Sequence, residues 1–241
     1  MKKKYNKLDN KKSKNLNLKA SVLTLSLLVG GSVSAGKNLL VVNASPDLEN
    51  SHSRSLARHF VEQVERRYPG QYNFIERDLE KTPIPSLRSN TLEIITAGNA
   101  STPEARSLLD LSDALINEIE QADGIVIAAP MHNFTVPSSL KSYFDVILRA
   151  GRTFKYTAEG PVGMLSNRPA MLLYASGGCY GGTDKDYLSG YVGCILRWIG
   201  IQNYKHIAAE GLAMQGRKEF SLQQAKQAIE EHLDSFLSPA Q

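Results

Sequence analysis

Short apolar runs alternate with longer amphipathic stretches from residue 37 to the end of the chain. A short apolar run bounded by turn-forming residues is typical of a strand, and apolar residues at every third or fourth position are typical of a helix packed on a core. The pattern predicts five strands, at residues 38–43, 72–77, 124–129, 170–175 and 201–208. It also predicts five helices, at residues 54–68, 103–121, 137–150, 187–199 and 221–237.

The order of these segments predicts the fold class. Strands that alternate with helices are typical of an α/β protein, in which helices cover both faces of a parallel sheet. Residues 124–129 are continuously apolar, as expected for a central strand, whereas residues 72–77 alternate like an edge strand. We therefore expect residues 36–241 to form one flavodoxin-like domain, a doubly wound five-stranded parallel sheet in the order 2-1-3-4-5.

Charge is distributed unevenly along the chain. Residues 1–35 contain eight lysines and one acidic residue, Asp9, and so carry a formal charge of +7; the total is +4, which leaves −3 for residues 36–241. A mildly acidic body without a stripe of Lys and Arg has no electrostatic footprint for nucleic acid. We therefore expect no nucleic-acid partner.

Residues 1–35 also differ from the body in their pattern. A lysine- and asparagine-rich stretch precedes an apolar run at residues 20–29 and small residues that end at Ala35. This order is typical of a secretory signal peptide, and cleavage after Ala35 would make the protein periplasmic or exported. A disordered lysine-rich extension, or a start site placed too early on a cytoplasmic protein, is the alternative. The apolar run is shorter than the ~20 residues that a membrane span needs, and we expect no span in the folded domain.

The two cysteines, Cys179 and Cys194, limit the covalent and metal chemistry. They are too few for a disulfide framework or for a metal site with four cysteine ligands. Free cysteine is among the most buried residue types, so we expect two reduced side chains at packed positions, although a single bridge stays possible. His, Asp and Glu are not clustered in a ligand pattern, and we expect no metal site.

The loop after the first predicted strand is rich in hydroxyl groups. Ligands of such sheets bind beyond the carboxyl ends of the strands, and Ser45, Ser51 and Ser53 lie there, just before a predicted helix. Hydroxyls at a helix N-terminus add donors to the unpaired backbone N–H groups and so favour a phosphate. The loop lacks the Gly-x-x-x-x-Gly-Lys pattern of nucleoside triphosphate sites. Capping of the helix by Ser51 or Ser53 is the alternative interpretation.

The loop after the third predicted strand contains Met131, His132, Asn133 and Phe134. A flavin ring needs this mixture, because apolar and aromatic groups contact its faces and amide or backbone groups bind its pyrimidine edge. His132 by itself is more often an ordinary loop histidine than a catalytic acid.

The loop after the fourth predicted strand begins with Ala175, Ser176, Gly177 and Gly178. Glycines let backbone amides approach a planar ligand closely. The three loops follow adjacent strands, so together they predict one site for a planar ligand that carries a phosphate.

Four stretches in the middle of the chain closely resemble the FMN-dependent NADH:azoreductases and the related NAD(P)H quinone reductases. They are Pro130-Met-His-Asn-Phe134, Leu140-Lys-Ser-Tyr-Phe-Asp145, Arg149-Ala-Gly-Arg-Thr-Phe-Lys-Tyr-Thr157 and Gly160-Pro-Val-Gly163. The similarity extends from Leu39 through Ser51-His-Ser53 and Asp78-Leu79 to Ala209-Glu-Gly211, and so covers residues 37–237. Two positions depart from the pattern: many relatives have tyrosine at position 132, and often a Ser-Arg or Thr-Gly-type pair in place of Ala175-Ser176.

The resemblance implies a flavin site with three parts. It places the FMN phosphate on Ser45, Ser51, His52 and Ser53. It places the isoalloxazine ring against Met131, His132, Asn133 and Phe134, with Ala175, Ser176, Gly177 and Gly178 at the pyrimidine end. It implies no catalytic side chain, since the flavin carries the chemistry.

The resemblance also implies an activity and partners. NADH or NADPH would reduce the flavin and leave, and a quinone or an aromatic azo compound would then take two electrons. The family is homodimeric, so a dimer is implied. Two other functions stay open: a flavodoxin-type electron carrier, which would have a strongly acidic surface and a shorter chain, and an FMN reductase that releases its flavin.

Overall fold

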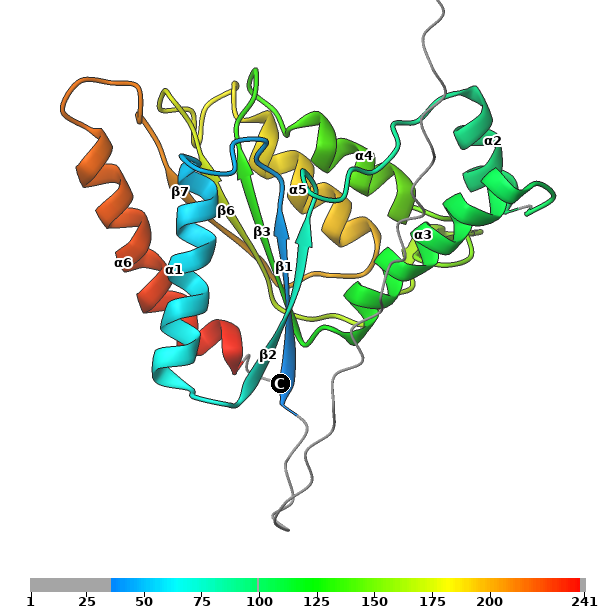
Figure 1. The fold of residues 1–241 in the computed structure, drawn as a ribbon, viewed down its shortest axis with the longest axis horizontal. Helices are drawn as coiled ribbons and strands as arrows, with labels where there is room; N and C mark the ends of the chain where they lie inside the picture. Colours follow the sequence, from blue (N-terminus) through cyan, green and yellow to red (C-terminus); the bar gives the residue numbers. More distant parts are fainter. Residues whose placement is uncertain (1–35, 99, 239–241) are drawn as a thin grey trace, which may run out of the picture. The chain divides into compact units, whose positions relative to one another are not determined.

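The computed structural model describes residues 36–98 and 100–238, so the predictions for residues 1–35 lie outside it. A parallel five-stranded sheet in the order β2-β1-β3-β6-β7 runs through the domain (Figure 1). Its strands are β1 (Lys37–Asn43), β2 (Tyr72–Asp78), β3 (Gly124–Pro130), β6 (Ala170–Ala175) and β7 (Tyr204–Ala209). In terms of these five strands the order is 2-1-3-4-5, which confirms the predicted flavodoxin-like sheet.

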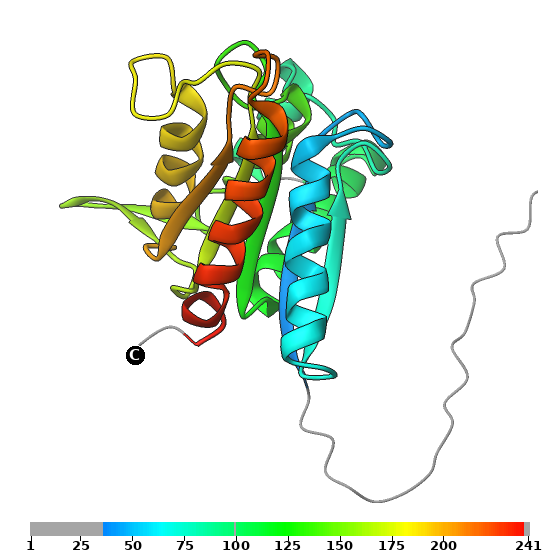
Figure 2. The same cartoon turned by 90° about the vertical axis from the view of Figure 1, so that its left-hand side faces the viewer.

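Helices cover both faces of the sheet, as predicted (Figures 1 and 2). They are α1 (His52–Arg67) and α6 (Lys218–Leu237) on one face, and α3 (Pro103–Gln121), α4 (Ser138–Ile147) and α5 (Tyr187–Trp198) on the other. Side chains of β1 alternate between the two cores: Leu40 packs with the α3–α5 side, and Leu39 and Val41 pack with the α1–α6 side. A central strand buried on both faces therefore has no polar side, which explains its continuous apolar sequence.

Three predicted boundaries were wrong by three residues: the end of α4, the start of the last strand, and the start of α6, which begins at Lys218 rather than at residue 221. The first two have a local cause. α4 ends at Ile147 rather than at residue 150, because the Thr153 hydroxyl donates to the Ile147 carbonyl at 2.8 Å and accepts the Arg149 N–H at 3.1 Å. The last strand begins at Tyr204 rather than at residue 201. The Asn167 side-chain oxygen accepts the N–H groups of residues 202 and 203, which holds that segment out of the sheet.

Three short elements were not predicted. Helix α2 (Ser89–Ala97) lies in the proline-punctuated connection after β2, and Ile95 is its single buried residue. Strands β4 (Phe154–Thr157) and β5 (Gly160–Gly163) form an antiparallel hairpin between α4 and β6. Each strand is only four residues long, and β5 consists of two glycines, a proline and a valine, so neither gives a run long enough to be recognised from periodicity.

The cysteines are free, as expected, but the expectation of packed positions was wrong because both Cys179 and Cys194 are exposed. Cys179 lies in the loop after β6, and Cys194 lies on the outer face of α5. In the part of the chain that the structure describes, no helix combines the length and the apolar character that crossing a membrane requires.

Candidate functional site

A cavity of about 430 Å³ lies at the carboxyl ends of β1, β3, β6 and β7. Eight of the twelve residues predicted for the site line it: Ser45, Ser51, His52, Met131, His132, Ala175, Ser176 and Gly177. The other four, Ser53, Asn133, Phe134 and Gly178, belong to the same loops but do not line the cavity. The structure therefore brings the three predicted loops together at one edge of the sheet.

The loop between β1 and α1 is ordered by its own short side chains. The Ser45 hydroxyl accepts the Asp47 N–H at 3.2 Å, and the Asp47 carboxylate accepts the N–H groups of Glu49 and Asn50 at 3.0 and 2.8 Å. These two backbone bonds hold the pKa of Asp47 below its usual value of 3.8. Hydrogen bonds within the loop therefore hold its shape.

Helix α1 begins directly at the cavity. The Ser51 hydroxyl caps it by accepting the Arg54 N–H at 3.3 Å, so the capping interpretation is correct for Ser51. Ser53 is fully buried, and its hydroxyl lies 3.1 Å from that of Ser51. The N–H groups of His52 and Ser53 belong to the first helical turn and have no carbonyl four residues earlier within the helix. The helix start therefore still offers donors to an anion.

His52 is the titratable side chain at the start of α1. Burial lowers its pKa below 6.5, the positive charge of Lys218 lowers it further, and the carboxylate of Asp47 opposes both effects. A histidine with a lowered pKa is neutral at pH 7. His52 can therefore donate a hydrogen bond to an anion but adds no formal charge.

A buried ion pair between Arg54 and Asp78 holds the loop between β1 and α1. Arg54 binds the Asp78 carboxylate with two bonds of 2.6 and 2.8 Å, and it donates to the Ser45 carbonyl through Nε and Nη2 at 3.1 and 2.6 Å. Both side chains are about 6% exposed. The planar guanidinium can satisfy both acceptors at once, which a lysine could not do. Arg54 thus ties the end of β2 to the loop after β1.

The loop after β3 makes a tight two-residue turn. His132 and Thr135 exchange backbone hydrogen bonds of 2.9 and 3.1 Å, and the two residues between them, Asn133 and Phe134, have φ values of 49° and 72°. Positive φ at both central residues is the pattern of a type I′ turn and is costly for residues other than glycine. The exposed Phe134 ring packs edge-on against Tyr180, with ring centroids 5.3 Å apart. This contact joins the loop after β3 to the loop after β6.

The loop after β6 is held by Glu210, which follows β7. One carboxylate oxygen of Glu210 accepts the N–H groups of Tyr180 and Gly181 at 2.7 and 2.8 Å. The Ser176 hydroxyl donates to the Gly178 carbonyl at 2.8 Å. A Cβ on Gly178 would lie 2.6 Å from the Tyr180 ring, so a side chain at this position would collide with that ring.

Comparisons with known proteins agree with this geometry. Residues 37–233 match the model of a family described as having a flavodoxin-like fold. The chain is 39% identical over 196 residues to an FMN-dependent NADH:quinone oxidoreductase of Cellvibrio japonicus, which covers 81% of this chain and 98% of the relative. The chain belongs to this family. An Alcanivorax borkumensis protein of the same name is 40% identical over 178 residues, 73% of this chain and 89% of the relative.

Solved structures of similar proteins give the same result. The FMN-dependent NADH-azoreductase of Bacillus anthracis, solved in complex with FMN, has a TM-score of 0.75 and 28% identity, and covers 84% of this chain and 100% of its own. An azoreductase from another strain of that species has a TM-score of 0.74 and 27% identity, with coverage of 83% and 100%. The family predicted from the sequence is thereby confirmed.

Three residues after β7 belong to or support the site and were not predicted from the sequence. Glu210, Leu212 and Ala213 follow β7, and the last two line the cavity. They were not predicted, because the site was expected in the loops after the first, third and fourth predicted strands. The matching stretch Ala209-Glu-Gly211 was the available signal, since a charged residue directly after a buried strand end needs a partner.

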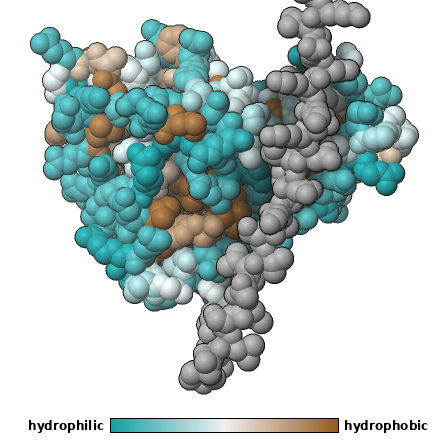
Figure 3. Space-filling view, viewed as in Figure 1, coloured by the Kyte–Doolittle hydropathy of each residue, from teal (hydrophilic) through white to brown (hydrophobic). Residues whose placement is uncertain are grey.

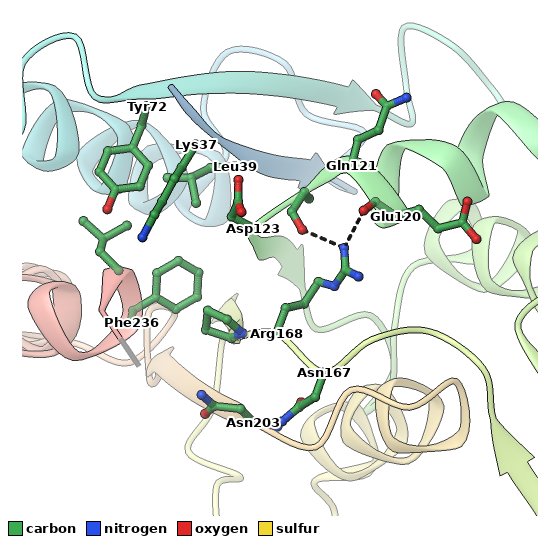
Figure 4. A pocket seen from close by; sticks show the side chains of 13 residues that line it. Lys37, Leu39, Tyr72, Glu120, Gln121, Asp123, Asn167, Arg168, Asn203 and Phe236 are labelled. Carbon is green, nitrogen blue, oxygen red and sulfur yellow. Dashed lines mark hydrogen bonds between the residues drawn. The ribbon is translucent and has the colours of Figure 1, made fainter. Parts of the chain in front are cut away.

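A second hollow of about 550 Å³ lies at the opposite edge of the sheet (Figure 4). Its polar groups include Arg168, which donates to the carbonyls of Ile119, Glu120 and Ala122 at the end of α3. The carboxylate of Asp123 accepts the Asn38 N–H at 2.7 Å. These groups hold the amino ends of the strands in place. Ligands of parallel sheets bind at the other edge, so this hollow is not the family's cofactor site.

Proposed function

We propose that this chain is an FMN-dependent NADH:quinone oxidoreductase that also cleaves aromatic azo compounds reductively. The observation that carries the proposal is the cavity at the carboxyl edge of the sheet, which joins a helix start rich in hydroxyls to a glycine loop. It lies in a chain that matches an enzyme of that name over 98% of its length. The azo activity rests on the two azoreductase structures.

The residues of the cavity fit FMN in three places. Ser45, Ser51 and the N–H group of His52 would hold the phosphate, with Ser53 acting through its contact with the Ser51 hydroxyl. Met131, His132, Asn133 and Phe134 would contact the ring system, and Ala175, Ser176, Gly177 and Gly178 would form its pyrimidine end. Within the described residues the Gly177 N–H donates no hydrogen bond, so it is free to bind an acceptor on the ring.

Bound FMN would supply the two-electron chemistry that links NADH or NADPH to the quinone or azo acceptor. The chain's own groups would then have three tasks. The contact between Phe134 and Tyr180 would hold the loops after β3 and β6 together beside the cavity. The Gly177 N–H would stabilise negative charge at the pyrimidine edge, and the fixed loop around Ser45 would hold the phosphate.

An absorbance spectrum of the full chain tests this proposal. We expect a bound flavin that bleaches on anaerobic addition of NADH and recovers fully on addition of a quinone. A flavin that NADH cannot bleach would indicate the electron carrier instead, and loss of flavin during gel filtration would indicate the FMN reductase that releases it. A chain that binds no flavin after reconstitution would refute the proposal.

Two substitutions in the loop after β3 test the proposed contacts with the flavin ring. Asn133→Ala is expected to weaken FMN retention more than His132→Tyr, because it removes an edge hydrogen-bonding group and keeps a positive φ that alanine tolerates less well. His132→Tyr restores the residue commoner in the family. Fluorescence titration of FMN into both variants measures this, with a difference of about tenfold expected for the loss of one hydrogen bond. Equal flavin loss in the two variants would contradict the assignment.

We infer that the enzyme is a homodimer that pairs through the β4–β5 hairpin and α5. Tyr156, Val162, Met164 and Trp198 are large apolar side chains with 71%, 45%, 45% and 36% exposure, and they lie on or beside these elements. The Phe154 ring contacts both Tyr156 and Trp198, with centroids 5.6 Å away in each case. An exposed apolar patch of this kind is typical of a protein interface.

Light scattering after gel filtration tests the dimer. The full chain is expected to elute at about twice 26.5 kDa, and Tyr156→Asp is expected to convert it to the monomer because the charge would be buried without a partner. Phe220→Asp is the matched control, since Phe220 is 63% exposed on α6 and lies outside the patch. A Tyr156→Asp dimer as stable as the unmodified one would place the interface elsewhere.

A further inference from the structure

A groove of about 600 Å³ lies between α1 and the edge strand β2, apart from the flavin cavity. Helix α1 packs on β1 and β3, so the neighbouring face of β2 is left open. Val41, Ala57, Val61 and Phe74 line the groove, and Leu48, which is 48% exposed, stands at one end. Figure 3 shows apolar side chains in a hollow between α1 and β2, surrounded by polar ones. No residue is shared with the flavin cavity.

The groove contains an amide whose hydrogen bonding is incomplete. Asn43 is 7% exposed, and its Oδ1 atom accepts no hydrogen bond within the described residues. Its Nδ2 atom donates to a carboxylate oxygen of Glu76 at 3.4 Å. Buried polar atoms are almost always paired, so an acceptor that is unpaired within the protein and lines a cavity can accept a hydrogen bond from a ligand. Turning the amide over would place its oxygen against the Glu76 carboxylate, which is worse.

Charge at the groove favours a cation. Glu62, Glu65 and Glu76 line it and make no ion pair within residues 36–98 and 100–238. Of the three cationic residues that line it, Arg54 is bound to Asp78 and Lys81 lies 3.7 Å from the same carboxylate. Arg58 makes no ion pair with any described residue, so three carboxylates line the groove against one unpaired guanidinium.

We propose that this groove binds a small primary amine with an apolar body. The body packs on Val41, Val61 and Phe74, and the ammonium group donates to Asn43 Oδ1 and to the carboxylate of Glu76. An ammonium donor suits Asn43 and Glu76, because a hydrogen bond in which the donor or the acceptor is ionised is about twice as strong as a neutral one. The proposal does not rest on the proposed reductase activity, since no residue lines both the groove and the flavin cavity.

The probe is 2-phenylethylamine, titrated into the full chain saturated with FMN so that the flavin cavity is filled. Its neutral and anionic analogues, 2-phenylethanol and 3-phenylpropionate, have a similar apolar body and serve as ligand controls. We expect the amine to bind about tenfold more tightly than the alcohol, and the anion more weakly still. Amide shifts in a ¹H–¹⁵N spectrum should centre on Val41, Val61 and Phe74.

Two substitutions complete the test. Glu76→Gln changes an exposed side chain and is expected to weaken amine binding about tenfold. Asn43→Leu removes the buried acceptor and is expected to have a similar effect. Glu231→Gln, an exposed carboxylate on α6, is the matched control and should leave binding unchanged. Equal binding of all three probes, amide shifts elsewhere, unchanged binding in Glu76→Gln, or an amine affinity weaker than about 10 mM would each overturn the proposal.

Discussion

Replacing Arg54 with methionine is expected to lower the free energy of unfolding by about 3–5 kcal/mol, because it leaves the Asp78 carboxylate buried without its partner. The variant also frees the Ser45 carbonyl, which Arg54 now holds with two bonds. Urea unfolding of the FMN-free protein measures the effect, since bound flavin would add its own stabilisation. Arg58→Met, one helical turn along α1 and exposed, should change stability by less than about 0.5 kcal/mol.

The stability lost in Arg54→Met is expected to become smaller as the pH falls. The two bonds from Arg54 are the main reason that the pKa of Asp78 falls from 3.8 to about 2, and the N–H groups of Glu80 and Lys81 add to the effect. A carboxylate with a lowered pKa stabilises the fold fully above pH 3.8 and loses that contribution as the pH falls through 2. The shift corresponds to about 2 kcal/mol. The difference in the free energy of unfolding between the unmodified protein and Arg54→Met should therefore become smaller between pH 4 and pH 2. A constant difference would mean that the Arg54–Asp78 pair does not titrate in this range.

Most of the fold was predictable because the buried strands have continuous apolar sequences. Residues 124–129 are apolar throughout, and the structure buries this segment of β3 on both faces. The elements that escaped prediction, α2 and the β4–β5 hairpin, bury little surface, so hydrophobic periodicity does not mark them. Boundaries failed where a side chain overrides periodicity, as Thr153 does at the end of α4 and Asn167 does before β7.

The sequence was enough to predict which loops form the site, but not which side chains in those loops face the cavity. Topology alone puts the carboxyl ends of adjacent strands at one edge, so Ser45, Met131 and Ser176 were expected to meet there, and all three line the cavity. Which side chains face the cavity depends on loop geometry that no periodicity encodes. Ser53 is fully buried, and Phe134, at a positive φ, packs its ring on Tyr180. Glu210 acts on a loop about 30 residues away in sequence, and that pairing exists only in three dimensions.

Glu210→Ala is expected to weaken FMN binding about a hundredfold, because it removes the acceptor from two backbone N–H groups of the loop after β6. That loop includes Ser176 and Gly177, which line the cavity, and Tyr180, which packs on Phe134. Once the N–H groups of Tyr180 and Gly181 are unpaired, the loop gains freedom that flavin binding must then remove. Fluorescence titration of FMN measures the change. Glu210 is thus a positioning residue, since the structure places its carboxylate on the loop and not on the cavity.

A matched series distinguishes this role from a general loss of stability. Glu210→Gln keeps an oxygen acceptor without the charge and should weaken FMN binding by about tenfold only, since neutral hydrogen bonds are about half as strong. Because Tyr180 and Gly181 lie in an exposed or half-buried loop, the FMN-free proteins should unfold within a few degrees of one another. Wild-type affinity in Glu210→Ala would show that the loop holds its shape without the carboxylate. An equally large loss of stability in the FMN-free variant would assign Glu210 to folding rather than to the site.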